Sequence, residues 1–187
     1  MSELRKELLR KSIHFSGLIY IPAYLFLGKE LLILSLIFVI AILLPIEFLR
    51  LKRGYFRFLA REYEEKKLGA YMYFLIAILT VTALFPKDSC FVALITAIVG
   101  DGTAGIARKI SGKDNFASFS MFLSSAIALA LLELLQISAL IAVLCGTVVE
   151  RIRKINGIYL QDNFSVPLLT AIADHSVKYI LSSQLKF

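Results

Sequence analysis

The sequence predicts an all-α integral membrane protein, a polytopic bundle of about seven transmembrane helices with a cytoplasmic N-terminus. Two observations predict this class. Hydrophobic residues make up 58% of the 187 residues and the mean hydropathy is +0.77, whereas an ordinary soluble domain is about 45–50% apolar. The apolar residues also gather in runs that approach the ~20 residues needed to cross a hydrocarbon core of ~30 Å.

Seven segments are expected to be these helices. Five of them contain no Asp, Glu, Lys or Arg and are rich in Leu, Ile, Phe and Ala: residues 12–28, 31–46, 68–86, 115–132 and 134–149. Two further segments, 89–107 and 164–183, contain ionisable residues, namely Asp101 in the first and Asp174, His175 and Lys178 in the second. Because an ionisable side chain facing lipid is costly, we expect both helices to turn these residues toward the protein interior.

The remaining residues form connections within one domain, residues 1–187. An N-terminal segment, 1–11, and a basic loop, 50–67, are expected on the cytoplasmic side, and short outer connections near 28–30, 86–88 and 136–138. The sequence contains no internal repeat or low-complexity linker, which favours one bundle. Cys90 and Cys145 lie in or beside apolar segments and are expected to pack there as small side chains.

The distribution of basic residues predicts the orientation. With a cytoplasmic N-terminus, all but four of the 21 Lys and Arg residues fall on the inner side, in the stretches 5–11, 50–67, 108–113 and 151–154. This satisfies the positive-inside rule. The net charge of +7 therefore reflects topology and contact with anionic lipid headgroups, and we expect no nucleic-acid partner.

A first group of polar residues lies where the N-terminal segment enters the membrane. On a helix, Arg10 and His14 share a face, with Lys11 beside them. A neutral histidine one turn inside the interface could accept a proton or contact a phosphate. Alternatively, the group is a basic collar at the membrane surface with a hydrogen-bonded interfacial histidine.

A second group surrounds Asp101. Glycines at 100, 102, 105 and 112 would let the backbone approach a phosphate chain, Asp101 could hold Mg²⁺, and Lys109 or Lys113 could neutralise charge. Small residues at Gly102 and Gly105 would also let membrane helices pack closely. Close packing explains the glycines but not the aspartate beside them, so we favour a functional site.

A third group lies at the inner junction of the last two helices and contains Glu150, Asp162, Asn163 and Pro167. Glu150 and Asp162 offer the hard oxygen ligands that Mg²⁺ prefers. Pro167 suits the first turn of a helix whose N-terminus faces phosphate. An Asp/Asn helix cap is the alternative explanation. Under the orientation predicted from the basic residues, all three groups fall on the cytoplasmic side.

At these residues the sequence resembles the CTP-dependent polyprenol kinase family, which includes dolichol kinases, phytol kinases and CTP-dependent diacylglycerol kinases. Three motifs spanning most of the chain carry the resemblance: Arg-Lys-x-x-His at 10–14, Gly-Asp-x-x-Ala at 100–104 leading to Gly-Lys at 112–113, and Glu150 followed by Asp-Asn-x-x-x-Pro at 162–167. Residues 113–118 depart from the pattern, because relatives carry a hydroxyl, a glutamate and a glycine between the lysine and the final serine.

The resemblance implies Mg²⁺-dependent transfer of the γ-phosphate of CTP to the hydroxyl of a polyprenol/dolichol-, phytol- or diacylglycerol-type lipid at the cytoplasmic face of the cell membrane. It implies catalytic roles for His14, Asp101 and Asp162, and metal binding by Asp101, Glu150 and Asp162. Residues expected to bind the nucleotide or its phosphates are Lys11, Gly100, Gly102, Gly105, Lys113 and Asn163.

Two other functions compete with this expectation. A CTP-dependent cytidylyltransferase making a CDP-lipid would share the nucleotide, the metal and the membrane face, although its usual His-Gly-Gly and Asp-Arg-x-Asp motifs are absent from the sequence. A small transporter could use Asp174, His175 and Lys178. Because Asp174 and Lys178 are i,i+4 neighbours, we favour a buried ion pair that locks helices together.

Overall fold

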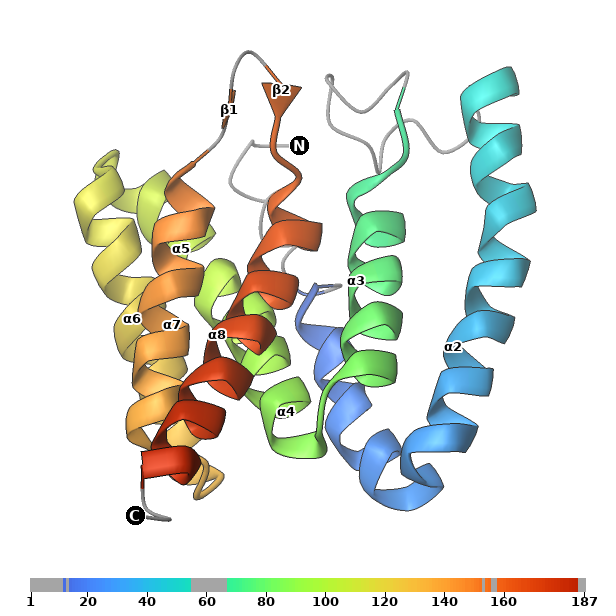
Figure 1. Ribbon diagram of the computed structural model, residues 1–187. Helices are drawn as coiled ribbons and strands as arrows, with labels where there is room; N and C mark the ends of the chain where they lie inside the picture. The colour runs from blue at the N-terminus through green and yellow to red at the C-terminus, as the bar shows by residue number, and fades with distance from the viewer. Residues whose placement is uncertain (1–11, 13, 55–66, 153, 156–157, 185–187) are drawn as a thin grey trace.

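The computed structural model describes residues 12, 14–54, 67–152, 154–155 and 158–184 (Figure 1). The N-terminal segment 1–11, with Lys11, and residues 55–66 of the expected basic loop lie outside the described residues. The chain is helical throughout most of its length, as the sequence predicts. The helical elements are η1 Ser16–Ile19, α2 Tyr20–Arg53, α3 Ala70–Leu84, α4 Lys87–Ile95, the π-helical turn η4 Thr96–Gly100, α5 Asp101–Ser111, α6 Asp114–Leu131, α7 Ile137–Arg151 and α8 Asp162–Gln184.

Within the described residues, three helical stretches are long and apolar enough to cross a membrane: Ser16–Arg53, Lys87–Ser111 and Asp114–Leu131. Ala70–Leu84 is a shorter apolar helix. A feature not expected from the sequence lies between α7 and α8, where β1 Lys154–Ile155 pairs antiparallel with β2 Ile158–Tyr159. The Asn-Gly pair that separates these strands in the sequence is a common two-residue hairpin signal.

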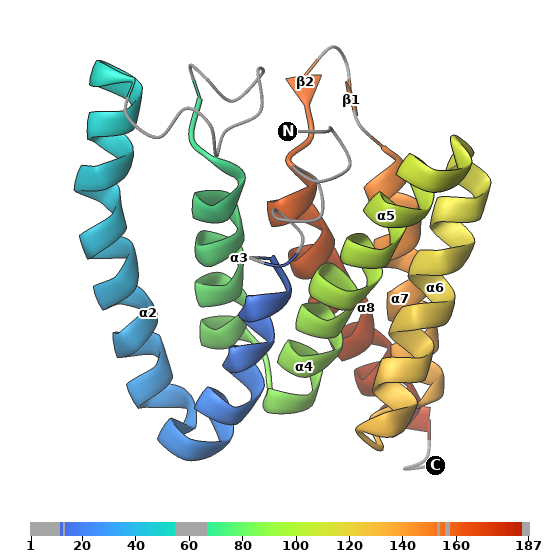
Figure 2. The same ribbon diagram turned by 180° about the vertical axis from the view of Figure 1, so that it is seen from behind.

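Helix α2 reverses direction at Gly28. This residue has φ 72° and ψ 175°, outside the helical region, in a left-handed φ range that glycine adopts without steric cost. The first part of α2 descends from the middle of the molecule, and the second part rises along its edge (Figures 1 and 2). The two expected helices 12–28 and 31–46 therefore correspond to the two arms of α2.

The helices alternate in direction, so their connections gather at two ends. The C-terminal ends of α2, α5 and α7 and the N-terminal ends of α3, α6 and α8 lie at one end, together with the β1–β2 pair (Figures 1 and 2). The bend of α2 and the α3–α4 and α6–α7 connections lie at the other. The connections expected to be cytoplasmic thus share one end of the bundle.

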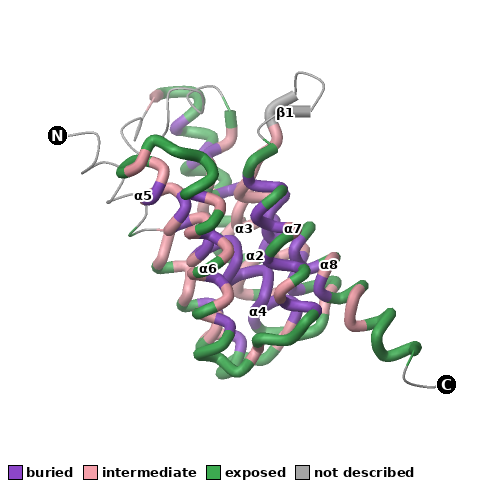
Figure 3. Tube along the Cα trace, turned by 90° about the vertical axis from the view of Figure 1, so that its left-hand side faces the viewer, coloured by how far each residue is buried: buried purple, intermediate pink, exposed green. Residues whose placement is uncertain are grey.

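The continuous helix formed by α4, η4 and α5 runs through the centre of the bundle. Every residue from 89 to 98 is buried, and Figure 3 shows this burial along α4. Small residues permit close packing around it. A Cβ atom at Gly146 of α7 would lie 2.5 Å from Thr170 Oγ1 of α8 and 2.9 Å from Thr96 Cγ2 of η4, so these three helices meet there.

A buried ion pair fixes the second arm of α2 against the start of α3. Glu47 is 1% exposed and Arg50 4% exposed. Arg50 donates from Nε and Nη2 to the two carboxylate oxygens at 2.7 and 2.8 Å, and also from Nη2 to the Lys67 carbonyl at 2.6 Å. Glu47 accepts further bonds from the Gly69 N–H at 2.6 Å and from the Tyr71 hydroxyl. The carboxylate is therefore fully engaged.

Replacing one member of this pair should be more harmful than replacing both. Arg50→Met leaves the Glu47 charge buried without its counter-ion, which costs about 3–5 kcal/mol of unfolding free energy. We expect the double variant Glu47→Gln/Arg50→Met to recover much of that loss in thermal unfolding in detergent. Arg53→Met, which removes an exposed charge from the same helix, is the control. Equal destabilisation by the single and double variants would show that the pair is not coupled.

Candidate active site

His14 joins the start of the chain to the central helix. It precedes η1, is partly buried, and its Nε2 lies 2.9 Å from the Ala97 carbonyl oxygen. Because a carbonyl can only accept a hydrogen bond, this contact requires the hydrogen to be on Nε2. In the neutral ring Nδ1 is then the basic nitrogen.

The π-helical turn η4 supplies the carbonyl that His14 contacts. Here the Asp101 N–H bonds to the carbonyl of Thr96, five residues earlier, which widens the helix by one residue. Ala97 lies inside this turn and accepts the bond from His14. π-Helical turns inside α-helices are rare and are frequent at functional sites. The apolar sequence of this stretch contains no signal that would have predicted the turn.

Asp101 begins α5 directly after the π turn and lies beside His14. Its Oδ2 is 3.7 Å from His14 Nε2, and each side chain is 16% exposed. This distance is too long for a hydrogen bond but short enough for the carboxylate to stabilise a protonated imidazole. The predicted proximity of the first two polar groups is therefore present in the folded chain.

The glycines near Asp101 lie in helical backbone. A Cβ atom at Gly100 would collide with Ser125 Oγ of α6, and one at Gly102 would lie 2.6 Å from the Phe15 ring. Close helix packing, the alternative considered from the sequence, therefore accounts for both residues. Gly105 is partly buried within α5. Phosphate contact by Gly100, Gly102 or Gly105 stays a prediction.

Glu150 lies in the last turn of α7 and is 5% exposed. Its Oε1 accepts a bond of 2.7 Å from Nη2 of Arg108. Its Oε2 is buried and has no hydrogen-bond partner among the described residues. Sequence reasoning missed Arg108 as a site residue. A signal was available, because Asp101 and Arg108 are seven residues apart and share a face of α5.

The charges of Asp101 and Asp162 act on the buried carboxylate of Glu150. Burial raises the pKa of Glu150, the Arg108 guanidinium opposes this shift, and the negative charges of Asp101 and Asp162 raise the pKa further. Because Coulombic interactions weaken with distance, these effects indicate that the start of α5, the end of α7 and the start of α8 face a common region. Of the three residues predicted to bind metal, Glu150 is thus the one on which the charges of the other two act.

Asp162 and Asn163 form the start of α8. The Asp162 Oδ1 atom accepts bonds from the Asn163 N–H at 2.8 Å and from its Nδ2 at 3.1 Å. These are contacts between adjacent residues, and a capping bond from the Asp162 side chain to the N–H of N2 or N3 is not among the contacts described. The expectation that Pro167 occupies the first turn is wrong. Since α8 begins at Asp162, earlier than the expected residue 164, Pro167 falls in the second turn.

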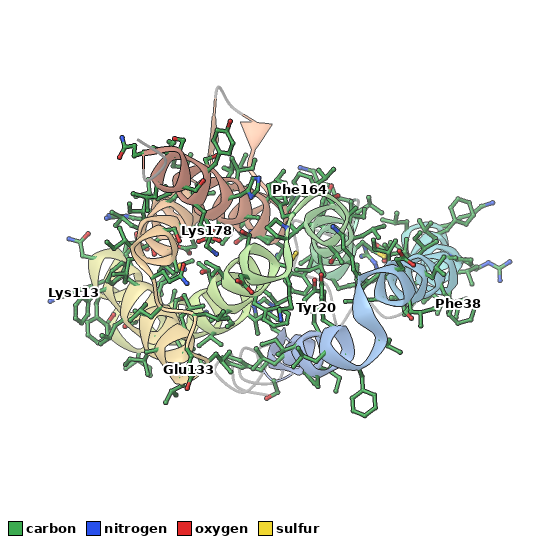
Figure 4. The ribbon with its side chains drawn as sticks, turned by 60° about the horizontal axis from the view of Figure 1, so that its bottom comes forward. Tyr20, Phe38, Lys113, Glu133, Phe164 and Lys178 are labelled. Atoms are coloured by element: carbon green, nitrogen blue, oxygen red, sulfur yellow. The ribbon has the colours of Figure 1, made fainter. Side chains whose placement is uncertain are left out.

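Lys113 does not join the acidic residues. It precedes α6, is exposed, and points outward at one edge of the bundle, while Phe38 points outward at the opposite edge (Figure 4). The other lysine expected to contact phosphate, Lys11, lies outside the described residues. The described structure therefore places His14 beside Asp101, and it places Glu150 within reach of the charges of Asp101 and Asp162.

The donor set suits Mg²⁺ only if a ligand completes the coordination. Among the described residues, no three His, Cys, Asp or Glu side chains lie close enough to hold a metal ion by themselves. Mg²⁺ in phosphate-binding sites commonly takes one or two carboxylates, and water and phosphate oxygens supply the rest. The unpartnered Glu150 Oε2, near the charges of Asp101 and Asp162, fits this pattern.

The ionisable residues of α8 form a separate cluster. Lys178 Nζ lies 2.8 Å from Asp174 Oδ2, which also accepts a 2.7 Å bond from Ser89 of α4. The expected i,i+4 ion pair is therefore confirmed. His175 is exposed and packs its ring against Phe85. The pair joins α8 to α4, three turns along α8 from Asp162.

Comparisons with protein-family models, with curated proteins and with solved structures find no match for this chain. The resemblance to the polyprenol kinases accordingly rests on the motifs of the sequence. The arrangement described above is independent of that resemblance, because it follows from the contacts among the helices.

The raised pKa of Glu150 predicts a pH dependence of stability. Its folded-state pKa lies above the ordinary value of 4.5, so the folded protein retains a proton that the unfolded chain has released. The stabilisation is complete below the unfolded pKa and is lost as pH rises through the folded pKa. We expect the thermal unfolding midpoint to fall as pH rises above 4.5, and Glu150→Gln to lose that part of the slope. An unchanged slope would contradict this, and Glu133→Gln, at an exposed position, is the control.

Proposed function

We propose that this protein is a CTP-dependent lipid-alcohol kinase whose active site lies at the cytoplasmic face of the membrane. The observation that carries the proposal is that His14 lies beside Asp101 on the central helix, and that the charges of Asp101 and Asp162 both act on the buried Glu150. Carboxylates beside a histidine suit a metal-dependent phosphate transfer to a hydroxyl. Glu150 lies where α7 ends and Asp162 where α8 begins, whereas Asp101 lies deeper along the central helix, which suits a donor that is dissolved in water and an acceptor that is held in lipid.

The proposed topology has seven membrane-spanning segments and a cytoplasmic N-terminus. Two facts support it. The described helices alternate in direction, and the described basic residues of the expected inner clusters lie toward the end that contains the acidic group (Figure 1). Because Lys and Arg are retained on the cytoplasmic side, this end is proposed to face the cytoplasm.

The reaction depends mostly on positioning and on neutralising phosphate charge. In the proposed step, the oxygen of the lipid hydroxyl attacks the γ-phosphorus of CTP. The bond from this phosphorus to the bridging oxygen breaks, and CDP leaves with the electron pair. His14, which lies beside Asp101, is proposed to accept the hydroxyl proton.

Asp101, Glu150 and Asp162 are proposed to hold the Mg²⁺ ion. When bound, Mg²⁺ supplies positive charge to the phosphates of CTP. Lys11 is proposed to neutralise the remaining phosphate charge and Asn163 to contact the nucleotide, whereas Lys113, which points outward, is not given this role. The acceptor is a polyprenol/dolichol-, phytol- or diacylglycerol-type alcohol, whose apolar chain remains in the membrane.

The function is tested by incubating the purified protein with γ-labelled CTP, Mg²⁺ and each class of lipid alcohol. We expect labelled lipid phosphate from the wild-type protein, and at least about a hundredfold less from Asp101→Asn or Asp162→Asn, because each removes charge that organises the transferred phosphate. Asp88→Asn, in the first turn of the same continuous helix and more than three turns before Asp101, is the control and should retain activity. A CDP-lipid product would indicate the cytidylyltransferase instead, and near-normal transfer by both variants would refute the site.

The orientation is tested with two cysteine substitutions that flank α6. In a Cys90→Ala/Cys145→Ala background, the variants Lys113→Cys and Glu133→Cys place a thiol at exposed positions before and after this helix. A membrane-impermeant maleimide should label Lys113→Cys in inside-out vesicles only, and Glu133→Cys in right-side-out vesicles only. The reagent cannot cross the intact membrane of a sealed vesicle. The reverse pattern would place the acidic group outside the cell.

A further inference from the structure

We propose that Arg108 is a positioning residue that holds the Glu150 carboxylate in place for the metal ion of the phosphate-binding site. The proposal rests on the proposed function, because it assigns a task to Arg108 within that site. Arg108 was not among the residues expected to act in the site. Its role is inferred from its contacts with α6 and α7.

Arg108 connects three helices through one guanidinium group. From α5 it donates from Nη2 to Glu150 Oε1 on α7 and from Nε to Asp114 Oδ1 on α6, each at 2.7 Å. A guanidinium is planar and its donors have fixed directions, so two charged bonds define its orientation. Asp114 therefore fixes the group that in turn holds Glu150.

Only one of the two carboxylate oxygens of Glu150 is hydrogen-bonded among the described residues. Oε1 is engaged, whereas Oε2 is buried without a hydrogen-bond partner among the described residues. A buried carboxylate oxygen without a partner costs free energy, so its retention suggests that a ligand completes it. The charges of Asp101 and Asp162 act on Glu150, which makes a cation the ligand that this position favours.

Arg108 carries one positive charge and contacts both Glu150 and Asp114. A divalent cation would bind at the Glu150 Oε2 atom, and the bond from Arg108 to Oε1 would fix the direction in which Oε2 points. Partners of this kind, which orient a metal ligand through a hydrogen bond, typically contribute about tenfold to hundredfold in metal affinity.

A neighbouring contact provides the matched control. Arg151, also a basic residue at this end, donates from Nη2 to Asn115 Oδ1 at 2.9 Å and thereby joins α7 to α6. This bond links α6 and α7, the two helices that Arg108 contacts from α5, but it does not involve Glu150. If Arg108 served only as a clamp between helices, loss of either arginine would have a similar effect.

The test measures metal binding directly. Purified wild-type, Arg108→Gln, Arg108→Lys and Arg151→Gln proteins are titrated with Mn²⁺ in the presence of CTP, and free Mn²⁺ is followed by electron paramagnetic resonance. We expect Arg108→Gln to weaken Mn²⁺ binding by about tenfold or more, and Arg151→Gln by less than about twofold. Arg108→Lys should recover part of the loss, because a lysine keeps the charge but not the fixed fork.

A further variant tests whether Arg108 acts through Glu150. If it does, Arg108→Gln should weaken Mn²⁺ binding no further in a Glu150→Gln background. Thermal unfolding and gel filtration establish that each variant is folded. If Arg108→Gln does not fold, the comparison is made between Arg108→Lys and the wild-type protein, and Arg108→Lys should still bind Mn²⁺ more weakly.

Equal effects of the Arg108 and Arg151 variants, or no effect of either, would overturn the inference. It would also be overturned if the wild-type protein bound no Mn²⁺ with CTP, since Glu150 would then have no metal to hold. Failure of the proposed function is seen separately, in the transfer assay. A protein that binds Mn²⁺ in an Arg108-dependent manner but transfers no phosphate would refute the kinase and support the positioning role.

Discussion

The central constraint on this fold is the close packing around the helix formed by α4, η4 and α5. Its residues from 89 to 98 are buried, so neighbouring helices must approach through small side chains such as Gly100 and Gly146. The π turn lies within this buried stretch, and its Ala97 carbonyl accepts the bond from His14. The helix continues into α5, where Asp101 is partly exposed while Gly102 and Ala104 are buried. The position of Asp101 beside His14 therefore follows from the packing of the core.

Buried charges join helices at three places in the described chain. Arg50 and Glu47 hold α2 near α3, Lys178 and Asp174 accompany the contact of α8 with Ser89 of α4, and Arg108 links α5 to α6 and α7 by the pairs described above. In each case the pairing compensates for the cost of removing a charge from water. Glu150 and Asp174 each keep one buried carboxylate oxygen without a hydrogen-bond partner among the described residues. The charges of Asp101 and Asp162 also act on the Glu150 carboxylate, which favours a cation as its ligand.

The sequence predicts the helices well, because each long apolar run has few alternatives to a helix in an apolar environment. The expected segments 68–86 and 134–149 correspond to α3 and α7. The burial of Glu47 and Arg50 could not be predicted, because a charge at the end of an apolar run ordinarily marks the membrane surface. No local sequence feature predicts the π turn. The Arg108 contact could have been predicted from the seven-residue spacing of Asp101 and Arg108, and the β1–β2 pair from the Asn-Gly turn between the strands. Asp101 and Asp162 were identified by residue type, but only the fold relates both to Glu150.

The reversal of α2 at Gly28 bears on how the chain enters a membrane. A single residue with positive φ joins two apolar arms, so no soluble linker separates them. Under the proposed topology, the first arm cannot enter the bilayer without bringing the second arm to its surface, because the second begins as soon as the first ends. We therefore expect the arms to insert together as a helical hairpin, and the polar residues that flank the pair to remain on the side from which synthesis proceeds.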